Sequence, residues 1–214
     1  GTHMEAAMDL HHSLIRELIT ECQCYEVKTI GDSFMIACPT IVDCAMLALA
    51  IQTKLYEAAW PEPIRDWKGN HASEEEASRA MSIWCGLRVR IGIHYCREVE
   101  PKFDVIHKRY DYYGHDVNMS ARVESIAQGG QILMTEDTHQ ILHSDPDFAT
   151  MIGDDAFIVR FASGVELKGV SDKMTMYSMV PTPLMMRRFE SIAGADTVTE
   201  VAPLSTGSHS MASI

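Results

Sequence analysis

The segment from Tyr110 to Arg122 brings an acid, an amide and a cation together in one short stretch of chain. Asp111 lies in an aromatic run, and Asn118 and Arg122 follow Gly114 at a spacing of four residues. If a helix begins after Gly114, Asn118 and Arg122 lie on the same helix face. A carboxylate can read a base, an amide can hold a ribose, and a guanidinium can neutralise a phosphate. The segment therefore indicates nucleotide chemistry.

A second polar group lies around the dipeptide Gly31-Asp32, which follows shortly after Lys28. A carboxylate at the tip of a hairpin is exposed and firmly held, which suits a hard cation such as Mg²⁺. The plainer interpretation of Gly-Asp is a tight turn, and Lys28 alone is a typical solvated strand lysine. The polar residues of the first segment also have plainer interpretations one by one, as turn and exposed helix residues. Only the combination favours a site.

Apolar periodicity predicts the elements that would position these residues. The predicted helices are Asp9 to Cys22, Ile41 to Ala59, Asp116 to Ala127, and Thr135 or Glu136 to about His143. The predicted strands are two within Cys24 to Cys38 joined at Gly31-Asp32, then Leu87 to Ile93, Tyr110 to Tyr113, Gln131 to Thr135, Ala156 to Phe161, Val165 to Lys168 and Met174 to Val180. Because helices and antiparallel strands mix without a regular alternation, the predicted class is α+β.

Two stretches receive no regular element. Residues 98–109 form a charged connection of unassigned structure, and residues 60–80 break the pattern with Pro61, Pro63 and a Gly69-Asn70 turn signal. Glu74 to Glu76, within the second stretch, read as a solvated loop or helix start rather than a metal site.

Composition narrows the function classes. The chain has 214 residues and a net charge of -12, which argues against a nucleic-acid binder. No apolar run approaches the roughly 20 residues of a membrane span, so we expect no membrane contact by this segment itself. The six cysteines lack metal-binding spacing and are expected to be buried thiols in a reducing compartment, with a disulfide pairing left open.

The chain resembles the catalytic domains of class III nucleotidyl cyclases. Five motifs occur in the order of that family: Lys28 to Met35, Arg88 to His94, Tyr110 to Arg122, Gly130 to Thr135, and Leu167 to Val170. The resemblance covers about Ala6 to Val180 and implies a ferredoxin-like fold with an antiparallel-rich sheet flanked by helices. The run from Tyr110 to Gly114 and the insert before it are most similar to receptor-type adenylate cyclases of kinetoplastid parasites.

The resemblance implies a role for each candidate residue in converting ATP to 3′,5′-cyclic AMP and pyrophosphate. Lys28 and Asp111 match the pair that reads adenine, Asn118 the residue that orients the ribose, and Arg122 the cation that stabilises the transferring phosphoryl group. Lys168, or less well Lys173, matches the basic residue near the triphosphate. Asp32 matches the second of two metal-binding aspartates, which in the family hold two Mg²⁺ or Mn²⁺ ions per site. The family site forms between two head-to-tail protomers, so we expect a homodimer in which Asp32 of one chain meets the other residues of its partner.

The family's first metal-binding aspartate lies in a strand before the first long helix, and this chain has no matching segment. Residues 1–4 look like the remnant of an expression tag. We therefore expect an N-terminally truncated catalytic domain over residues 5–183 that lacks its first strand and has little or no cyclase activity. Residues 184–214 are expected to form a disordered tail. The resemblance also implies the cytoplasmic face of a membrane-anchored receptor.

Two other functions remain open. The same fold can serve as a non-catalytic nucleotide-binding or dimerisation module. A ferredoxin-like ligand-sensing domain without nucleotide chemistry is the second, and it gives no reason for Lys28, Asp32, Asp111, Asn118 and Arg122 to occur together.

Overall fold

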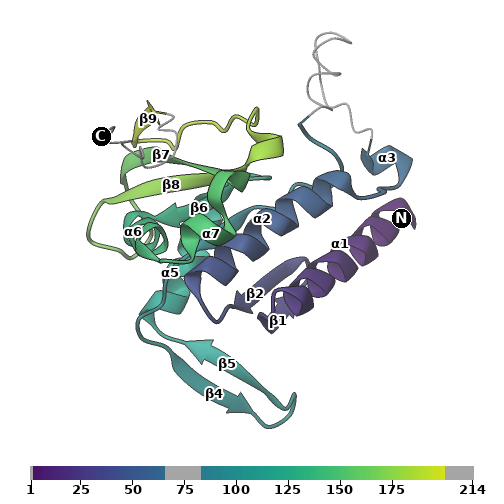
Figure 1. Ribbon diagram of the computed structural model, residues 1–214. Coiled ribbons are helices and arrows are strands. Elements are labelled where there is room, and N and C mark those ends of the chain that lie inside the picture. Colours follow the sequence, from purple (N-terminus) through teal and green to yellow (C-terminus); the bar gives the residue numbers. More distant parts are fainter. Residues whose placement is uncertain (1, 66–82, 201–214) are drawn as a thin grey trace, which may run out of the picture.

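A five-stranded sheet with helices on both faces forms the centre of the computed structural model, which describes residues 2–65 and 83–200 (Figure 1). The strand order is β3-β6-β8-β7-β9, and the pairs are antiparallel except for the parallel pair of β3 and β6. The strands are β3 (Ile91–Ile93), β6 (Ile132–Thr135), β7 (Ala156–Val165), β8 (Met174–Pro181) and β9 (Asp196–Glu200). Mixed helices and mainly antiparallel strands confirm the predicted α+β class.

The helices are α1 (Thr2–Glu21), α2 (Ile41–Glu57), α3 (Glu62–Arg65), α5 (His115–Ile126), α6 (Glu136–Ser144) and α7 (Phe148–Met151), with 3-10 turns η1 (Gly153–Asp155) and η2 (Thr182–Leu184). The four longest helices agree with the predicted ones, although α1 begins earlier than the predicted Asp9. Within residues 2–65 and 83–200, no helix has the length and apolar content needed to cross a bilayer.

Strand β6 divides the core into two layers because its side chains alternate between the faces of the sheet. Ile132 and Met134 pack with residues of α2, α6 and α7, whereas Leu133 packs with Met119 and Val123 of α5. The three β6 side chains are fully buried. Helix α5, which carries two of the candidate residues, is therefore held against the face of the sheet opposite α2.

Gly92 of β3 allows α5 to lie unusually close to the sheet. A Cβ atom at this position would lie 2.3 Å from the main-chain nitrogen of Glu124, a separation that real Cβ atoms do not show. The predicted strand from Leu87 to Ile93 is shorter in the structure, because only Ile91–Ile93 pairs with β6. Strand β3 lies at one edge of the five-stranded sheet.

A separate hairpin carries Lys28 and Asp32. Strands β1 (Tyr25–Ile30) and β2 (Ser33–Ala37) pair antiparallel on either side of the turn at Gly31. The φ of Gly31 is 63°, in the left-handed region that glycine adopts without a steric penalty. Helix α1 packs on this hairpin and on α2, and its buried residues Ile15, Leu18 and Ile19 form one cluster with α2. The predicted strand, turn and strand are confirmed here.

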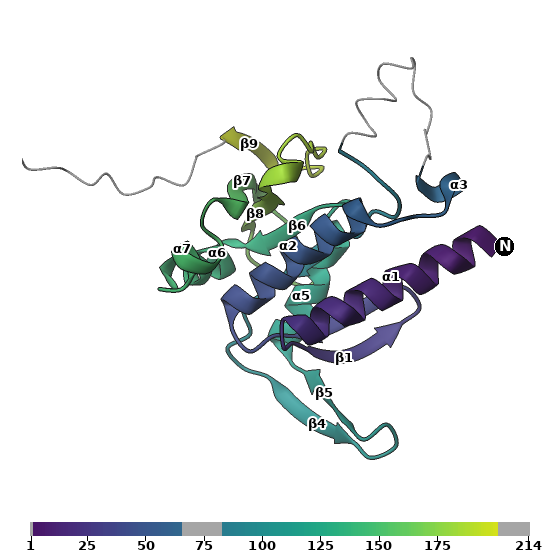
Figure 2. The ribbon, with the colours of Figure 1, turned by 45° about the vertical axis from the view of Figure 1, so that its right-hand side comes forward.

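A second hairpin projects away from the rest of the molecule (Figures 1 and 2). Strand β4 (Glu100–Asp104) pairs with β5 (Arg109–Tyr113), so the charged connection without an assigned structure forms half of a hairpin. Its tip exposes Val105 and Ile106. The predicted strand from Tyr110 to Tyr113 is confirmed as β5.

The structure differs from the prediction at two places near the C-terminus. Residues Val165 to Lys168 do not form a separate strand, because β7 already ends at Val165 and a turn follows. Strand β9 lies within the segment expected to be disordered, where the β-branched residues Thr197, Val198 and Thr199 favour an extended chain that pairs with β7. Glu74 to Glu76 and the tail residues 201–214 lie outside the described residues.

Candidate functional site

Lys28 and Asp111 form an ion pair between two separate sheets. The Lys28 ammonium donates to both carboxylate oxygens of Asp111, with Nζ–O distances of 2.9 and 2.8 Å. The two side chains are 32% and 20% exposed, so they are partly withdrawn from water but open on one side. Residues 83 positions apart in the sequence thus meet at one point, and they are the two that the resemblance assigns to adenine.

The Asp111 carboxylate also accepts hydrogen bonds from its own strand. The main-chain N–H of Tyr112 donates to Oδ1 at 2.8 Å, and the hydroxyl of Tyr113 donates to Oδ2 at 2.9 Å. The hydrogen bond from Lys28 is the largest of the influences that hold the pKa of Asp111 below its ordinary value, and Tyr113 and Tyr112 add to it. Asp111 therefore remains a carboxylate acceptor at neutral pH.

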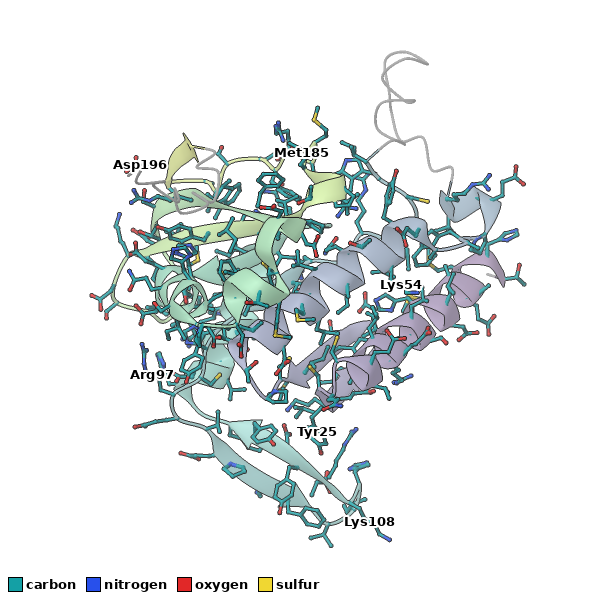
Figure 3. The ribbon with its side chains drawn as sticks, in the orientation of Figure 1. Tyr25, Lys54, Arg97, Lys108, Met185 and Asp196 are labelled. Carbon is teal, nitrogen blue, oxygen red and sulfur yellow. The ribbon has the colours of Figure 1, made fainter. Side chains whose placement is uncertain are left out.

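Tyr25 holds the projecting hairpin beside Lys28. Its hydroxyl accepts from the main-chain N–H of Tyr110 at 2.9 Å and donates to the carbonyl of Tyr110 at 3.3 Å. Its ring meets the ring of Tyr112 edge to face, with centroids 6.3 Å apart. Figure 3 shows Tyr25 on the side of the body that faces the hairpin, and Lys108 at the far end of the hairpin. The Lys28–Asp111 ion pair and these contacts of Tyr25 together connect β5 to β1, although the two strands belong to different sheets.

Asn118 and Arg122 lie one turn apart on α5. The helix begins after Gly114, whose φ of 129° turns the chain sharply out of β5. Asp116 in its first turn accepts hydrogen bonds from the main-chain N–H groups of Arg97 and Glu98, which ties the start of α5 to the chain that enters β4. Asn118 is exposed, so its side chain is accessible to a ligand.

The Arg122 guanidinium is held against the turn that contains Lys168. Its Nη2 lies 3.4 Å from the place where a Cβ atom of Gly169 would be, and its Nη1 is buried without a hydrogen-bond partner in the described part of the chain. A buried donor without an acceptor is costly, by about 1–3 kcal/mol. The cost would be relieved by an anionic oxygen, such as that of a phosphate.

The two candidate lysines for the triphosphate differ in their surroundings. Lys173 forms an exposed ion pair with Glu166, with an Nζ–Oε1 distance of 3.1 Å. Lys168 is exposed and forms no ion pair with any residue of the described ranges. Because Lys168 also adjoins the turn beside Arg122, it is the better placed of the two.

Asp32 lies in the turn at the tip of the hairpin whose strand β1 carries Lys28. It is exposed in the β1–β2 turn, and the ring Nε2 of His12 donates to the neighbouring Gly31 carbonyl at 3.1 Å. Within residues 2–65 and 83–200, Asp32 has no hydrogen bond or ion pair with Asp111, Asn118 or Arg122. The same residues contain no cluster of three or more His, Cys, Asp or Glu side chains that could hold a metal ion. One chain therefore brings Lys28 to Asp111, and Arg122 to the Lys168 turn, but does not add Asp32.

The sequence reasoning missed Tyr25 and Tyr113 as parts of the site. Tyr113 follows Asp111 by two residues on a strand, a spacing that places both on one face, and this signal was available. The role of Tyr25 had no signal in the sequence, because it depends on β1 and β5 meeting without sharing a ladder.

Comparison with protein families gives one match over most of the chain. Residues 1–181 match the family described as the adenylate and guanylate cyclase catalytic domain. The chain is similar to receptor-type adenylate cyclase A of Leishmania donovani, with 36% identity over 228 residues, and to a receptor-type adenylate cyclase of Trypanosoma congolense, with 35% identity over 194 residues. These alignments cover 95% and 82% of this chain, but only 16% and 25% of the two relatives.

Solved structures agree. A Trypanosoma brucei adenylate cyclase in its monomeric state has a TM-score of 0.74 and 32% identity, covering 88% of this chain and 83% of the other. The adenylyl cyclase CyaB of P. aeruginosa has a TM-score of 0.55 over 85% of this chain and 84% of that one, and at 18% identity it supports the fold alone.

Proposed function

We propose that this chain, which belongs to the adenylate and guanylate cyclase catalytic domain family, binds ATP and forms part of the site that converts it into 3′,5′-cyclic AMP and pyrophosphate. The observation that carries the proposal is the ion pair of Lys28 and Asp111, which joins a carboxylate acceptor to an ammonium donor at a partly open position. The named adenylate cyclases among its relatives favour ATP over GTP as the substrate.

The ion pair has the polarity needed to read adenine. The adenine edge offers an amino group as donor beside a ring nitrogen as acceptor, whereas guanine carries a carbonyl oxygen where adenine carries the amino group. In our proposal Asp111 accepts from the amino group and Lys28 donates to the ring nitrogen. With guanine, Asp111 would face another acceptor, and a buried mismatch of that kind is costly.

The residues on and beside α5 would contact the rest of the nucleotide. Asn118 would orient the ribose so that its 3′-oxygen can attack the α-phosphorus in line, and Arg122 would stabilise the charge that develops on the phosphoryl group. Lys168 would bind the triphosphate tail. Since the chain carries a net charge of -12, these few cations must create a local positive field for a polyphosphate.

The proposal gives this chain one ligand for a divalent ion but no complete metal site. Asp32 offers one carboxylate to a Mg²⁺ or Mn²⁺ ion, and such ions take much of their coordination from water and substrate phosphates. A single carboxylate does not fit the two-ion site of the family, and the described residues contain no larger cluster of ligands. We therefore derive no catalytic step through the ions, and we propose that this chain alone has little or no cyclase activity.

A head-to-tail homodimer would complete the constellation. In such a pair Asp32 of one protomer would face Lys28, Asp111, Asn118, Arg122 and Lys168 of its partner, and two-fold symmetry would give two equivalent sites. Within the described part of one chain, Asp32 forms no hydrogen bond or ion pair with these residues, which supports this arrangement. We further propose, from the family resemblance, that the domain works at the cytoplasmic face of a membrane-anchored receptor; the relatives' names give only the receptor type.

A non-catalytic nucleotide-binding or dimerisation module is the second candidate. It predicts the same ATP binding without turnover, even when a segment carrying the missing aspartate is restored.

The test measures ATP and GTP binding by calorimetry, and cyclic AMP formation with Mg²⁺ or Mn²⁺. We expect Lys28→Met and Asp111→Asn each to weaken ATP binding by about tenfold or more, the value of one charged hydrogen bond. Glu26→Gln is the matched control, because Glu26 lies on the same strand but pairs with Arg16. Absence of ATP binding by the unmodified chain, or an equal loss in the control, would contradict the proposal. A longer chain with the upstream segment separates the catalytic from the non-catalytic candidate.

A further inference from the structure

The Asp111 carboxylate is surrounded by donors from its own protein. It accepts two hydrogen bonds from Lys28, one from the Tyr112 main chain and one from the Tyr113 hydroxyl, at distances from 2.8 to 2.9 Å. A carboxylate has about four lone-pair positions. In the free protein the acceptor that should read the base is therefore already fully used.

Lys28, unlike Asp111, still has hydrogen-bonding capacity to spare. Its ammonium has three N–H donors, and two of them point to Asp111. The third is free to meet a ring nitrogen of a base. An incoming adenine therefore finds a donor ready at Lys28 but no vacant acceptor at Asp111, and one of the four donors must leave before its amino group can bind.

Tyr113 is the donor that can leave at the lowest cost. Tyr112 donates through the main chain of β5, and Lys28 is needed for the base itself. Tyr113 is 47% exposed and is the last residue of β5, followed directly by Gly114. A released phenol at such a position is hydrated at once, so freeing it costs about one net hydrogen bond and leaves no buried donor unpaired. Its ring also lies beside the Lys28 ammonium, with Nζ 5.4 Å from the ring centroid.

We propose that the Tyr113 hydroxyl occupies, in the free chain, the place at Asp111 that the amino group of adenine takes in the complex, so that ATP must displace it to bind. This inference rests on the proposed function and adds to it. When ATP binds, the adenine amino group replaces the Tyr113 hydroxyl as a donor to Asp111, so the carboxylate keeps the same number of hydrogen bonds. A base that presents an acceptor to Asp111 cannot make this exchange, and the tyrosine remains in place against it.

The decisive variant is Tyr113→Phe, which removes the hydroxyl and keeps the ring beside Lys28. Because ATP no longer has to displace a hydrogen bond, its affinity should rise by about threefold to tenfold, the value of one net hydrogen bond. GTP affinity should change by less than about twofold, since GTP displaces nothing at this position. Tyr110→Phe is the matched control, because Tyr110 lies on the same strand and is similarly exposed, and it should leave both affinities unchanged.

The unmodified chain supplies an independent readout. Its hydrogen bond to Asp111 raises the pKa of Tyr113 above the ordinary value for tyrosine. In a sample with ¹³C-labelled tyrosine rings, the Tyr113 signal should titrate at a lower pH once ATP is saturating, because the phenol has left the carboxylate. Saturating GTP should leave that titration in place.

The outcomes separate this inference from the proposed function. If the unmodified chain binds no ATP, the proposed function fails and this inference with it. If ATP binds but Tyr113→Phe binds it equally well or more weakly, or the Tyr113 titration does not move, the exchange at Asp111 is wrong while the proposed function stands.

Discussion

Arg122 is packed against the rest of the fold and yet has an unsatisfied buried donor, a combination not expected of a residue with a purely structural role. Its guanidinium packs against the Gly169 turn, yet its buried Nη1 has no hydrogen-bond partner within the described residues. Burying a donor without an acceptor costs stability. A cation that the fold leaves unsatisfied, on the helix face that also carries Asn118, is what a site for an anionic ligand requires.

Replacing Arg122 by Met should therefore separate stability from binding. Methionine keeps the apolar stem that packs on the helix and removes the unsatisfied donors, so we expect the free energy of unfolding to stay within about 0.5 kcal/mol or to rise. ATP affinity should fall by about tenfold or more, because a charged hydrogen bond to phosphate is lost. Urea unfolding and calorimetric titration measure the two quantities.

Arg90→Met is the control for this variant. Arg90 also carries a cation beside α5, but it pairs with Glu124 at the surface. Its replacement should leave ATP binding nearly unchanged. A loss of stability in Arg122→Met of several kcal/mol would instead identify Arg122 as a structural residue.

At the scale of the elements, the position of the β4–β5 hairpin decides whether Asp111 can reach Lys28. Apart from its covalent ends, the hairpin is joined to β1 by the ion pair and by the two hydrogen bonds of the Tyr25 hydroxyl. Neither β4 nor β5 forms a ladder with another sheet among the described strands. These polar contacts, with the edge-to-face contact of the Tyr25 and Tyr112 rings, hold the hairpin against β1.

Tyr25→Phe should loosen this attachment without unfolding the body. We expect a loss of about 1–2 kcal/mol in the free energy of docking, from two neutral hydrogen bonds, and faster hydrogen exchange at the amide groups of Tyr110 and its neighbours. Hydrogen-exchange mass spectrometry on peptides covering residues 98–114 measures this directly. Peptides from β6 and β8 are internal controls, and equal acceleration there would mean that the whole fold was weakened.

The elements also show what the sequence could predict. Alternation from Tyr25 to Ala37 and helical spacing in α1, α2, α5 and α6 sufficed, because each of these elements buries one regular face. Strand β4 gave no such signal: most of its residues are exposed and it contains Pro101, which a two-stranded edge tolerates. The alternation from Leu87 to Arg90 was misleading, since a strand also needs a partner and only Ile91–Ile93 has one.

The candidate site was predictable only through the resemblance. No local pattern links Lys28 to Asp111, because the contact joins two different sheets across 83 residues. The same is true of Arg122 and the Lys168 turn. The spacing of two residues placed Tyr113 on the same strand face as Asp111, but the hydrogen bond between the two side chains is seen only in the structure.

For the molecule as a whole, partly buried histidines should make the free energy of unfolding depend on pH. The His94 side chain is 9% exposed and its Nδ1 lies 3.2 Å from Thr135 Oγ1. His139 stacks on Tyr177 with ring centroids 3.9 Å apart, and its buried Nδ1 has no partner among the described residues. Burial is the main cause that lowers the pKa of both histidines, and the neighbouring His143 lowers that of His139 further.

The sign of the effect follows from these lowered pKa values. As the pH falls through the ordinary histidine pKa of about 6.5, the unfolded chain takes up protons before the folded chain does. The free energy of unfolding should therefore fall from about pH 7 downward, until the pH passes below the lowered folded pKa values. Each such histidine contributes a slope of at most about 1.4 kcal/mol per pH unit within that window.

Urea unfolding at pH 7.5, 6.5 and 5.5, values chosen around that ordinary pKa of about 6.5, measures the slope. His139→Phe keeps the stacked ring but cannot take up a proton in the unfolded chain, so its slope should be smaller and its stability at the lowest pH higher than that of the unmodified chain. His3→Gln is the control, because His3 is exposed on α1. If His139→Phe and the unmodified chain had parallel stability curves, the burial of His139 would not be what links folding to pH.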